Sequence, residues 1–245
     1  MVFLGDRRRL GVRVALVAMA AAWSLAAHAQ EPVIGLLSLP EVFGNGSCDR
    51  FTPVEISLHA TPAASGAVGS IRVDAYWTFQ DDLSCDGLSV RVHRTGTDRV
   101  GELPTREFDY ETPGAIVTDR RDRWFKVRLN DGSAWLHASD RDEFYPLQKL
   151  ISSDLAHLTE AFAGTRLSPT PGATGRVIVA TDGRPQPPVR VREFRTVNNR
   201  LWVHVEVLSH SVCEGDAMPK VIAQGWLAAH DASGEPTVWF PSRGC

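Results

Sequence analysis

The chain has 245 residues, of which 43% are hydrophobic and 22% charged, and its formal net charge at neutral pH is −3. That length suits one large domain or two small ones. A weakly acidic chain without a block of lysine and arginine argues against nucleic acid and anionic lipid as partners, because both select clustered positive charge.

Residues 1–29 have the features of a secretory signal peptide. Three consecutive arginines begin at Arg7, residues 14–27 form an uncharged apolar run, and small side chains precede a cleavage site after Ala29. The apolar run is shorter than the roughly 20 residues that span a bilayer. We therefore predict a signal peptide, a mature chain of residues 30–245 with no integral membrane segment, and a periplasmic or secreted location.

The first repeated segment of the mature chain lies at residues 58–68, LHATPAASGAV, and matches residues 167–177, LSPTPGATGRV. Leucine, Thr-Pro, glycine and valine recur in the same order. This order predicts a strand, a proline turn, a glycine turn and a second strand in each copy.

The first copy then contains an additional stretch with strand periodicity. Apolar and polar side chains alternate from Ile71 to Phe79 and again from Leu88 to Val92, with a turn-rich segment at residues 81–87 between them. Alternation with a period of two residues is typical of strands. We expect a two-stranded β-hairpin insertion here, held in place by Cys85.

A second repeated segment is centred on tryptophan. Residues 123–129, RWFKVRL, match residues 201–207, LWVHVEV, and Ala-Trp-Leu at 134–136 matches Gly-Trp-Leu at 225–227. The Asn-Asp-Gly sequence at 130–132 predicts a tight hairpin in the first copy. The positions predicted to share a buried face are Phe125, Val127 and Leu129 in the first copy, and Val203, Val205 and Val207 in the second.

Residues 147–164 connect the two copies. Leu155, Leu158 and Phe162 recur at helical spacing, with a possible cap at Ser153. This pattern predicts one short helix that contacts a neighbouring module.

Four cysteines follow the signal peptide: Cys48, Cys85, Cys213 and Cys245. An even number in an exported chain favours disulfides, and four cysteines allow three connectivities. We prefer Cys48–Cys85 and Cys213–Cys245, because each pair then falls within one copy. Each bridge would stabilise its copy by roughly 3–4 kcal/mol in the chain-entropy model.

The order of leucine, turn, Gly-x-Val, Trp-x-x-Val, turn and small-Trp-Leu resembles the bacterial Src homology 3 (SH3)-like domain. The resemblance is strongest over residues 122–137, DRWFKVRLNDGSAWLH, and returns at 198–207 and 224–230. It implies an all-β fold of two small SH3-like β-barrels in tandem, joined by a short helix, with a β-hairpin insertion in the first. The implied boundaries are 1–29 for the signal peptide, 30–146 for the first module, 147–164 for the helical connector and 165–245 for the second module.

The sequence contains no recognisable catalytic motif. It has neither a G-x-S-x-G nucleophile turn nor an H-E-x-x-H metal motif, so we expect no enzyme activity, no metal and no cofactor. A zinc site remains an alternative, and its candidate ligands are His204, His210, Cys213 and His230. The acidic run from Glu102 to Glu111 is interpreted as a solvated loop.

Aromatic side chains are the remaining candidates for binding. Trp124 and Trp202 fall on the polar faces of their strands, and SH3-type folds receive peptides in shallow aromatic grooves. The alternative is that both tryptophans are buried under loops. The candidate ligand-binding residues are Trp77, Tyr110, Trp124, Trp202 and Trp239.

These observations favour an exported, non-enzymatic binding module of the cell envelope. SH3-like domains of bacteria often accompany cell-wall hydrolases or bind peptidoglycan, so the resemblance implies a cell-wall glycopeptide or an envelope protein as the partner. Two alternatives remain open: a structural or assembly subunit that docks a partner chain, and an unrecognised hydrolase that uses histidine with aspartate or glutamate.

Overall fold

The computed structural model describes residues 30–43, 54–75, 88–152, 155–159, 166–173, 176–177, 186–214 and 217–240. The chain separates into two compact units, Met1–Gln30 and Glu31–Cys245, and the second unit is described below. The predicted signal peptide lies outside the described residues. Within the part of the chain that is described, no helix has the length and apolar character needed to cross a membrane.

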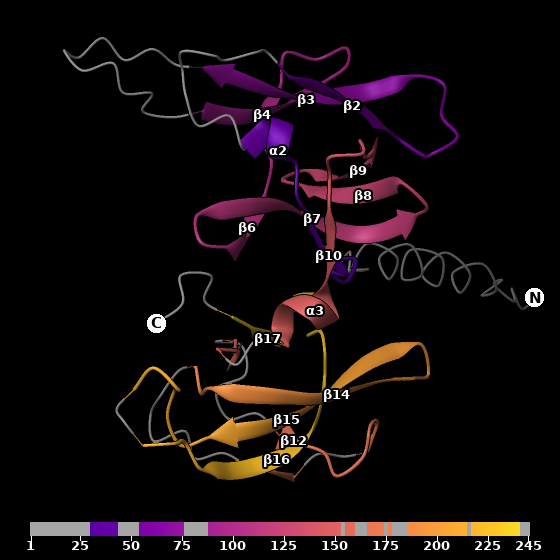
Figure 1. Cartoon of the computed structure of the whole chain (residues 1–245). Coiled ribbons are helices and arrows are strands. Elements are labelled where there is room, and N and C mark those ends of the chain that lie inside the picture. The colour runs from indigo at the N-terminus through magenta and orange to yellow at the C-terminus, as the bar shows by residue number, and fades with distance from the viewer. Residues whose placement is uncertain are drawn as a thin grey trace, which may run out of the picture. The chain divides into compact units, whose positions relative to one another are not determined.

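The described chain is mostly antiparallel β-structure, which confirms the predicted all-β class (Figure 1). A ten-stranded sheet has the order β10-β1-β7-β8-β9-β2-β3-β4-β5, with β6 paired to β7. Its strands are β1 (Gly35–Leu37), β2 (Glu55–His59), β3 (Ala67–Ala75), β4 (Leu88–Arg94), β5 (Val100–Glu102), β6 (Thr105–Asp109), β7 (Thr112–Arg121), β8 (Trp124–Leu129), β9 (Gly132–His137) and β10 (Phe144–Pro146).

A second sheet contains β14 (Val189–Val197), β15 (Arg200–Leu208) and β16 (Val221–Ala228). Two short pairs accompany it, namely β11 (His157–Leu158) with β17 (Val238–Trp239), and β12 (Arg166–Leu167) with β13 (Arg176–Val177). The described helices are short: α2 (Pro40–Phe43) and α3 (Leu147–Ile151).

The two tryptophan segments have the same pairing register. Trp124 of β8 lies opposite His137 of β9, and Trp202 of β15 lies opposite Ala228 of β16. These four residues occupy aligned positions in the two sequence repeats. The repeated sequence therefore produces the same hairpin register twice.

The hairpins formed by β7 with β8 and by β14 with β15 also share an irregularity. A β-bulge lies between Val117 and Asp119 where β7 meets β8, and another lies between Val191 and Glu193 where β14 meets β15. Both bulges occur at the same point of the repeat. Because a bulge locally increases the twist of its strand, the two hairpins twist at equivalent positions.

In both copies the first repeated segment (residues 58–68 and 167–177) also pairs with the tryptophan-centred segment at the same position. His59 of β2 pairs with Trp135 of β9, and Ser168 forms an isolated bridge with Trp226 of β16. The turns that follow are alike as well. The Ala64 amide donates to the Thr61 carbonyl at 3.1 Å, and the aligned Ala173 amide donates to the Thr170 carbonyl at 3.2 Å.

The predicted buried faces are confirmed. All six apolar side chains expected to face inward are at most 4% exposed: Phe125, Val127, Leu129, Val203, Val205 and Val207. The two strands expected here are paired, because β3 lies antiparallel to β4 from Gly69 opposite Arg94 to Ala75 opposite Leu88, whereas their being an insertion in an SH3-like module stays a prediction. The connecting residues 76–87, which include Trp77 and Cys85, lie outside the described residues.

The predicted helix over Leu155, Leu158 and Phe162 is wrong where the structure describes it. The described helix of this segment, α3, lies earlier, and Leu158 belongs to β11. The Leu158 amide donates to the Pro187 carbonyl at 3.0 Å, and its side chain is 1% exposed. A buried amide needs a partner, and the isolated bridge between His157 and Pro188 supplies one here. Phe162 lies outside the described residues.

One hydrophobic core is shared by residues of both copies. Val203 and Val205 of the second copy belong to the same buried cluster as Leu36 of β1, Ile116 of β7 and Leu150 of α3. A second buried cluster lies within the first copy alone, around residues such as Leu58, Ile71 and Val127. The second copy is therefore packed directly against elements that precede it in the chain.

Truncation of a repeat leucine tests this shared core. Leu167 is fully buried, so we expect Leu167→Ala to lower the free energy of unfolding by about 2–5 kcal/mol, measured by urea denaturation. The control is Ile222→Ala, because Ile222 is 54% exposed and should change stability by less than about 0.5 kcal/mol. Equal effects of the two substitutions would contradict the described packing.

Candidate functional site

The outward side of the first copy carries an aromatic cluster. Trp124 lies edge-on to His59, with ring centroids 5.2 Å apart, and edge-on to His137 at 5.1 Å. Residues directly opposite one another on antiparallel strands share a face of the sheet, so the β8–β9 and β9–β2 registers place these rings together with Trp135. We call His59, Trp124, Trp135 and His137 the first aromatic face.

An arginine covers the buried tryptophan of this face. The guanidinium carbon of Arg121 lies 5.0 Å from the Trp135 ring centroid, a cation–π distance. Trp135 is only 4% exposed, whereas the Arg121 side chain is 66% exposed. Arg121 Nη2 also lies 3.9 Å from Asp119 Oδ2. The face therefore presents the solvent-accessible guanidinium of Arg121, which lies over the indole of Trp135.

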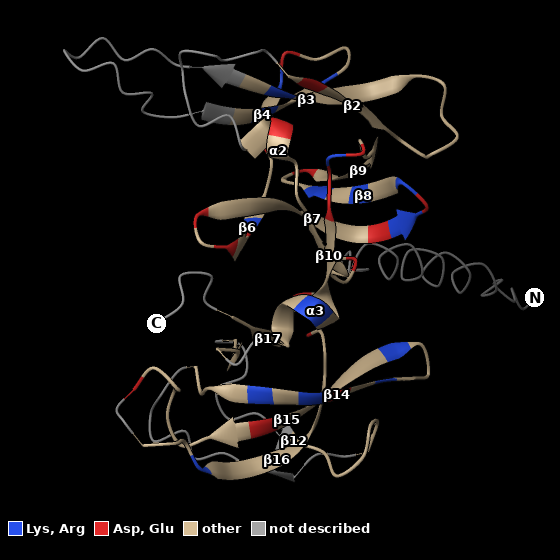
Figure 2. Ribbon diagram, in the orientation of Figure 1, with Lys and Arg blue, Asp and Glu red and all other residues tan. Residues whose placement is uncertain are grey.

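The second copy repeats this arrangement. Arg195 lies 4.9 Å from the Trp226 ring centroid, and its Nε is 2.6 Å from Glu193 Oε1. Arg195 and Arg121 hold the same register position, each opposite the first tryptophan of its repeat. Figure 2 shows further basic positions along β14. We call Trp202, His204 and Trp226 the second aromatic face.

The two faces differ in the groups around their tryptophans. In the first, two histidines flank Trp124. In the second, the positions aligned with His59 and His137 are Ser168 and Ala228, and His204 contacts Trp226 instead, at 5.1 Å. Arg200 lies 5.5 Å from the Trp202 centroid. Both faces combine aromatic rings with cations, but each has its own polar neighbours.

The other sequence-predicted ligand residues lie elsewhere. Trp77 is outside the described residues. Tyr110, at the turn between β6 and β7, is 59% exposed. Trp239 of β17 stacks on Phe240 at 5.4 Å and lies under Arg106 at 4.7 Å. The structure therefore gives Trp124 and Trp202 equivalent places in the two copies, and it places Trp239 apart from both, beside Phe240 and Arg106.

Sequence reasoning missed the residues that complete the faces, namely His59, Arg121, His137 and Arg195. A signal for one of them was present. Once the hairpin at Asn130-Asp131-Gly132 fixes the register, His137 must lie opposite Trp124. The arginines gave no such signal, because the bulges shift the register just before them.

The strands β2, β3 and β4 carry a polar cluster that contains the residue types of a hydrolase site, namely serine, histidine and glutamate. Ser70 lies opposite His93, and Arg72 Nη2 donates to Glu55 Oε1 at 2.9 Å. The pKa of Glu55 is lowered, first by a hydrogen bond from Ser70 and next by that from Arg72. A nucleophilic serine needs a base that accepts its proton. A carboxylate with a lowered pKa is a weak base, so Glu55 is a poor proton acceptor for Ser70.

The candidate zinc ligands are engaged in separate contacts. His204 contacts Trp226, the His210 ring bonds the Ser209 hydroxyl and the Ala217 carbonyl, and His230 Nε2 lies 2.6 Å from the Val33 carbonyl. Burial is the main cause that lowers the pKa of His230. Among the described residues, no group of three His, Cys, Asp or Glu side chains could hold a metal ion.

Cys213 is the cysteine that the described residues include, and it is not a free thiol. Cys48, Cys85 and Cys245 lie outside the described residues. The pairings Cys48–Cys85 and Cys213–Cys245 therefore stay predictions.

No protein-family model, curated protein or solved structure matches the chain.

The ion pairs of Glu206 beside the second face carry a pH-dependent prediction. Glu206 Oε2 lies 2.8 Å from Arg192 Nη2 and 3.5 Å from Arg190 Nη1. The hydrogen bond from Arg192 is the main cause that lowers the pKa of Glu206 below its usual 4.5. Because the pKa of Glu206 is lower in the folded state than in the unfolded state, its ionised form stabilises the fold at any pH above the unfolded-state pKa. This stabilisation is lost as the pH falls through the folded-state pKa.

We expect Glu206→Gln to lower the free energy of unfolding at pH 7 by about 1–3 kcal/mol, measured by urea denaturation across a pH series. The difference from the parent should shrink steadily below pH 4.5. The matched control is Asp140→Asn, because the Asp140 side chain is 97% exposed in its pair with Arg123 and should matter little. A Glu206→Gln effect that is constant with pH would rule out the ion pairs as its source.

Proposed function

We propose that this chain is an exported, non-enzymatic binding protein of the cell envelope, and that its two aromatic faces contact the ligand. We further propose that it consists of two SH3-like β-barrels in tandem, residues 30–146 and 165–245. The observation that carries the proposal is the duplicated pair of an exposed arginine on a buried tryptophan, Arg121 on Trp135 and Arg195 on Trp226.

The chemistry of the faces suits a glycopeptide. Tryptophan supplies a large rigid surface with few rotatable bonds, and arginine recognises carboxylates through a planar fork of donors. Arginine and tryptophan are also enriched among residues that dominate binding energies. A cell-wall glycopeptide offers both sugar rings and peptide carboxylates, which makes it the ligand class we favour. An envelope protein with acidic and aromatic surface residues is the other partner of this chemistry.

The presence of two aromatic faces in one chain favours binding to a polymeric ligand. A chain that carries two related faces binds a repeating polymer at two places, and the second contact forms at a high effective concentration. Weak individual faces then produce appreciable retention on the polymer.

A docking role is a second candidate, supported by exposed apolar side chains in the second copy. Met218, Val221 and Ile222 are 80%, 47% and 54% exposed, and they lie at or just before the start of β16. Clustered exposed apolar side chains are typical of protein–protein contacts. In this case the chain is an assembly subunit, and a partner chain covers this end of β16.

The binding proposal is tested by co-sedimentation of residues 30–245 with insoluble peptidoglycan. We expect the protein to pellet, and we expect Arg121→Ala and Arg195→Ala each to weaken retention by about tenfold. The double variant should be weaker than either single variant, because two contacts are lost. Arg72→Ala removes the same charge from an exposed pair with Glu55 and should bind like the parent.

Protein that stays wholly in the supernatant would defeat the cell-wall version of the proposal. Crosslinking in envelope extracts then tests the docking role, with Ile222→Glu as the variant. A monomer with no crosslinked species would count against that role. Loss of a crosslinked partner in Ile222→Glu, but not in Arg72→Ala, would support it.

A further inference from the structure

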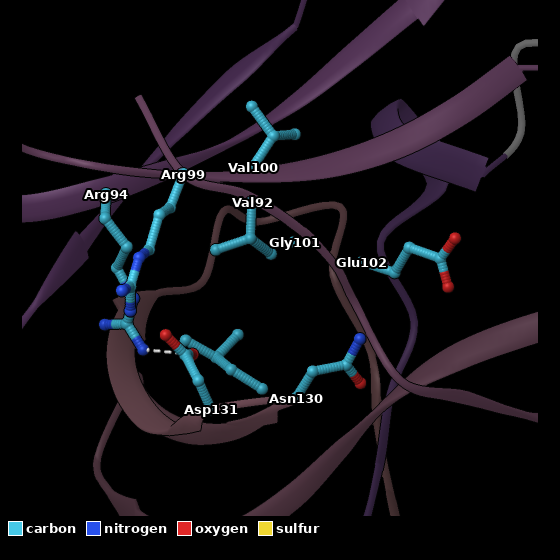
Figure 3. Close-up of a pocket in the computed structure, with 9 residues that line it drawn as sticks. Val92, Arg94, Arg99, Val100, Gly101, Glu102, Asn130 and Asp131 are labelled. Atoms are coloured by element: carbon cyan, nitrogen blue, oxygen red, sulfur yellow. Dashed lines mark hydrogen bonds and ion pairs between the residues drawn. The ribbon is translucent and has the colours of Figure 1, made fainter. Parts of the chain in front are cut away.

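A pocket of about 260 Å³ lies between β4, β5 and the turn that joins β8 to β9 (Figure 3). None of the residues of the two aromatic faces lines it. Its apolar walls include Val92 and Leu129, which are 3% and 4% exposed and belong to the core of the first copy. Its polar lining includes Arg94, Arg99 and Asp131.

The pocket is open because a side chain is missing at Gly101. Gly101 of β5 lies opposite Val92 of β4, so both positions face the same side of the sheet. Val92 reaches the core there, whereas a Cβ built on Gly101 would meet no heavy atom within 4 Å. The space that a core side chain would occupy is therefore accessible from the protein surface.

The charged lining of the pocket consists of two arginines, Arg94 and Arg99, and two carboxylates, Glu102 and Asp131. Arg94 Nη2 donates to Asp131 Oδ1 at 2.6 Å, and this bond is the main cause that lowers the pKa of Asp131, with a smaller contribution from the charge of Arg99. Figure 3 shows the Arg94 and Arg99 guanidinium groups together beside Asp131, while the Glu102 carboxylate points away from them. At this end of the pocket two guanidinium groups therefore lie beside a single carboxylate, and this local excess of positive charge attracts a second carboxylate.

The strand beside the pocket is an edge. β5 is the last strand in the order of the sheet, and within the described residues its only partner is β4. A second cavity of about 590 Å³ continues along the same strand toward Phe43 and Leu103. Edge strands present unpaired backbone groups to which an extended peptide can bind as a further strand.

We propose that this pocket binds the C-terminal residue of an extended peptide. The terminal carboxylate lies against Arg99 and Arg94, a small aliphatic side chain fills the space left at Gly101, and the preceding residues follow β5 toward the second cavity. At about 260 Å³ the pocket is smaller than the roughly 300–1,000 Å³ of pockets for drug-sized ligands, so it has room for a single small residue rather than for a larger ligand. The proposal does not rest on the function proposed for the aromatic faces.

The probe is the tripeptide acetyl-Ala-Ala-Val with a free carboxylate, compared with the same peptide as its C-terminal amide. Both are titrated into ¹⁵N-labelled residues 30–245 and followed by amide chemical shifts. We expect the acid to shift the amides of Gly101 and Asn130, and to bind about tenfold or more tightly than the amide, because only the acid makes charge-assisted hydrogen bonds.

Variants locate the site. Gly101→Leu fills the pocket and should abolish the shifts, and Arg99→Gln should weaken binding of the acid by about tenfold while leaving the amide unchanged. The matched controls are Gly66→Leu, at a second glycine with no heavy atom near a built Cβ, and Arg72→Gln. If Gly101→Leu does not fold, Gly101→Ala and Arg99→Gln carry the test.

Three results would overturn the proposal. One is equal affinity of the acid and the amide, and another is unchanged binding of the acid in both Arg99→Gln and the Gly101 variant. The third is the absence of any shift at the highest soluble peptide concentration. Hexanoate is included as a non-peptide carboxylate. If it binds as tightly as the tripeptide, the edge strand contributes nothing, and this result overturns the proposal as well.

Discussion

The Glu235 carboxylate connects the end of the chain to the first sheet through two arginines. Arg106 Nη2 of β6 lies 2.5 Å from Glu235 Oε2, and Arg128 of β8 contacts the other carboxylate oxygen. All three side chains are at most 28% exposed. Burial lowers the pKa of Arg106, and the charge of Glu235 opposes this effect. Without that carboxylate, two partly buried cations would face each other uncompensated, an arrangement that is strongly destabilising. Nearby, the Val33 amide donates to the Gly234 carbonyl and His230 contacts the Val33 carbonyl.

This ionic contact accompanies the hydrophobic core that both copies share. Val203 and Val205 lie in one buried cluster with Leu36 and Leu150, so the second copy completes its core with residues from β1 and α3. The segments that carry the two sequence repeats are thus joined by burial as well as by the chain. Under the proposed binding role, two faces held by one shared core would lose little conformational entropy on contacting one ligand.

Sequence patterns predicted those features of the fold that depend on residues close together in the chain, namely strand faces and a tight turn. Period-two alternation identified the buried faces of β8 and β15, and Asn130-Asp131-Gly132 identified the turn that fixes the position of Trp124 opposite His137. The short helix expected at Leu158 was wrong, because three apolar residues at helical spacing do not outweigh the pairing of Leu158 with Val238. Contacts between distant segments were not predictable. The Arg128–Glu235 pair and the pocket at Gly101 depend on which strands become neighbours in the fold. The identity of these residues does not predict the order of the strands.

The claim on which the account rests is that the two copies share one core and therefore unfold together. Differential scanning calorimetry of residues 30–245 measures this directly. The account predicts a single transition whose calorimetric and van't Hoff enthalpies agree, as for a two-state unit. Two resolved transitions, or a calorimetric enthalpy well above the van't Hoff value, would show that the copies unfold independently and would contradict it.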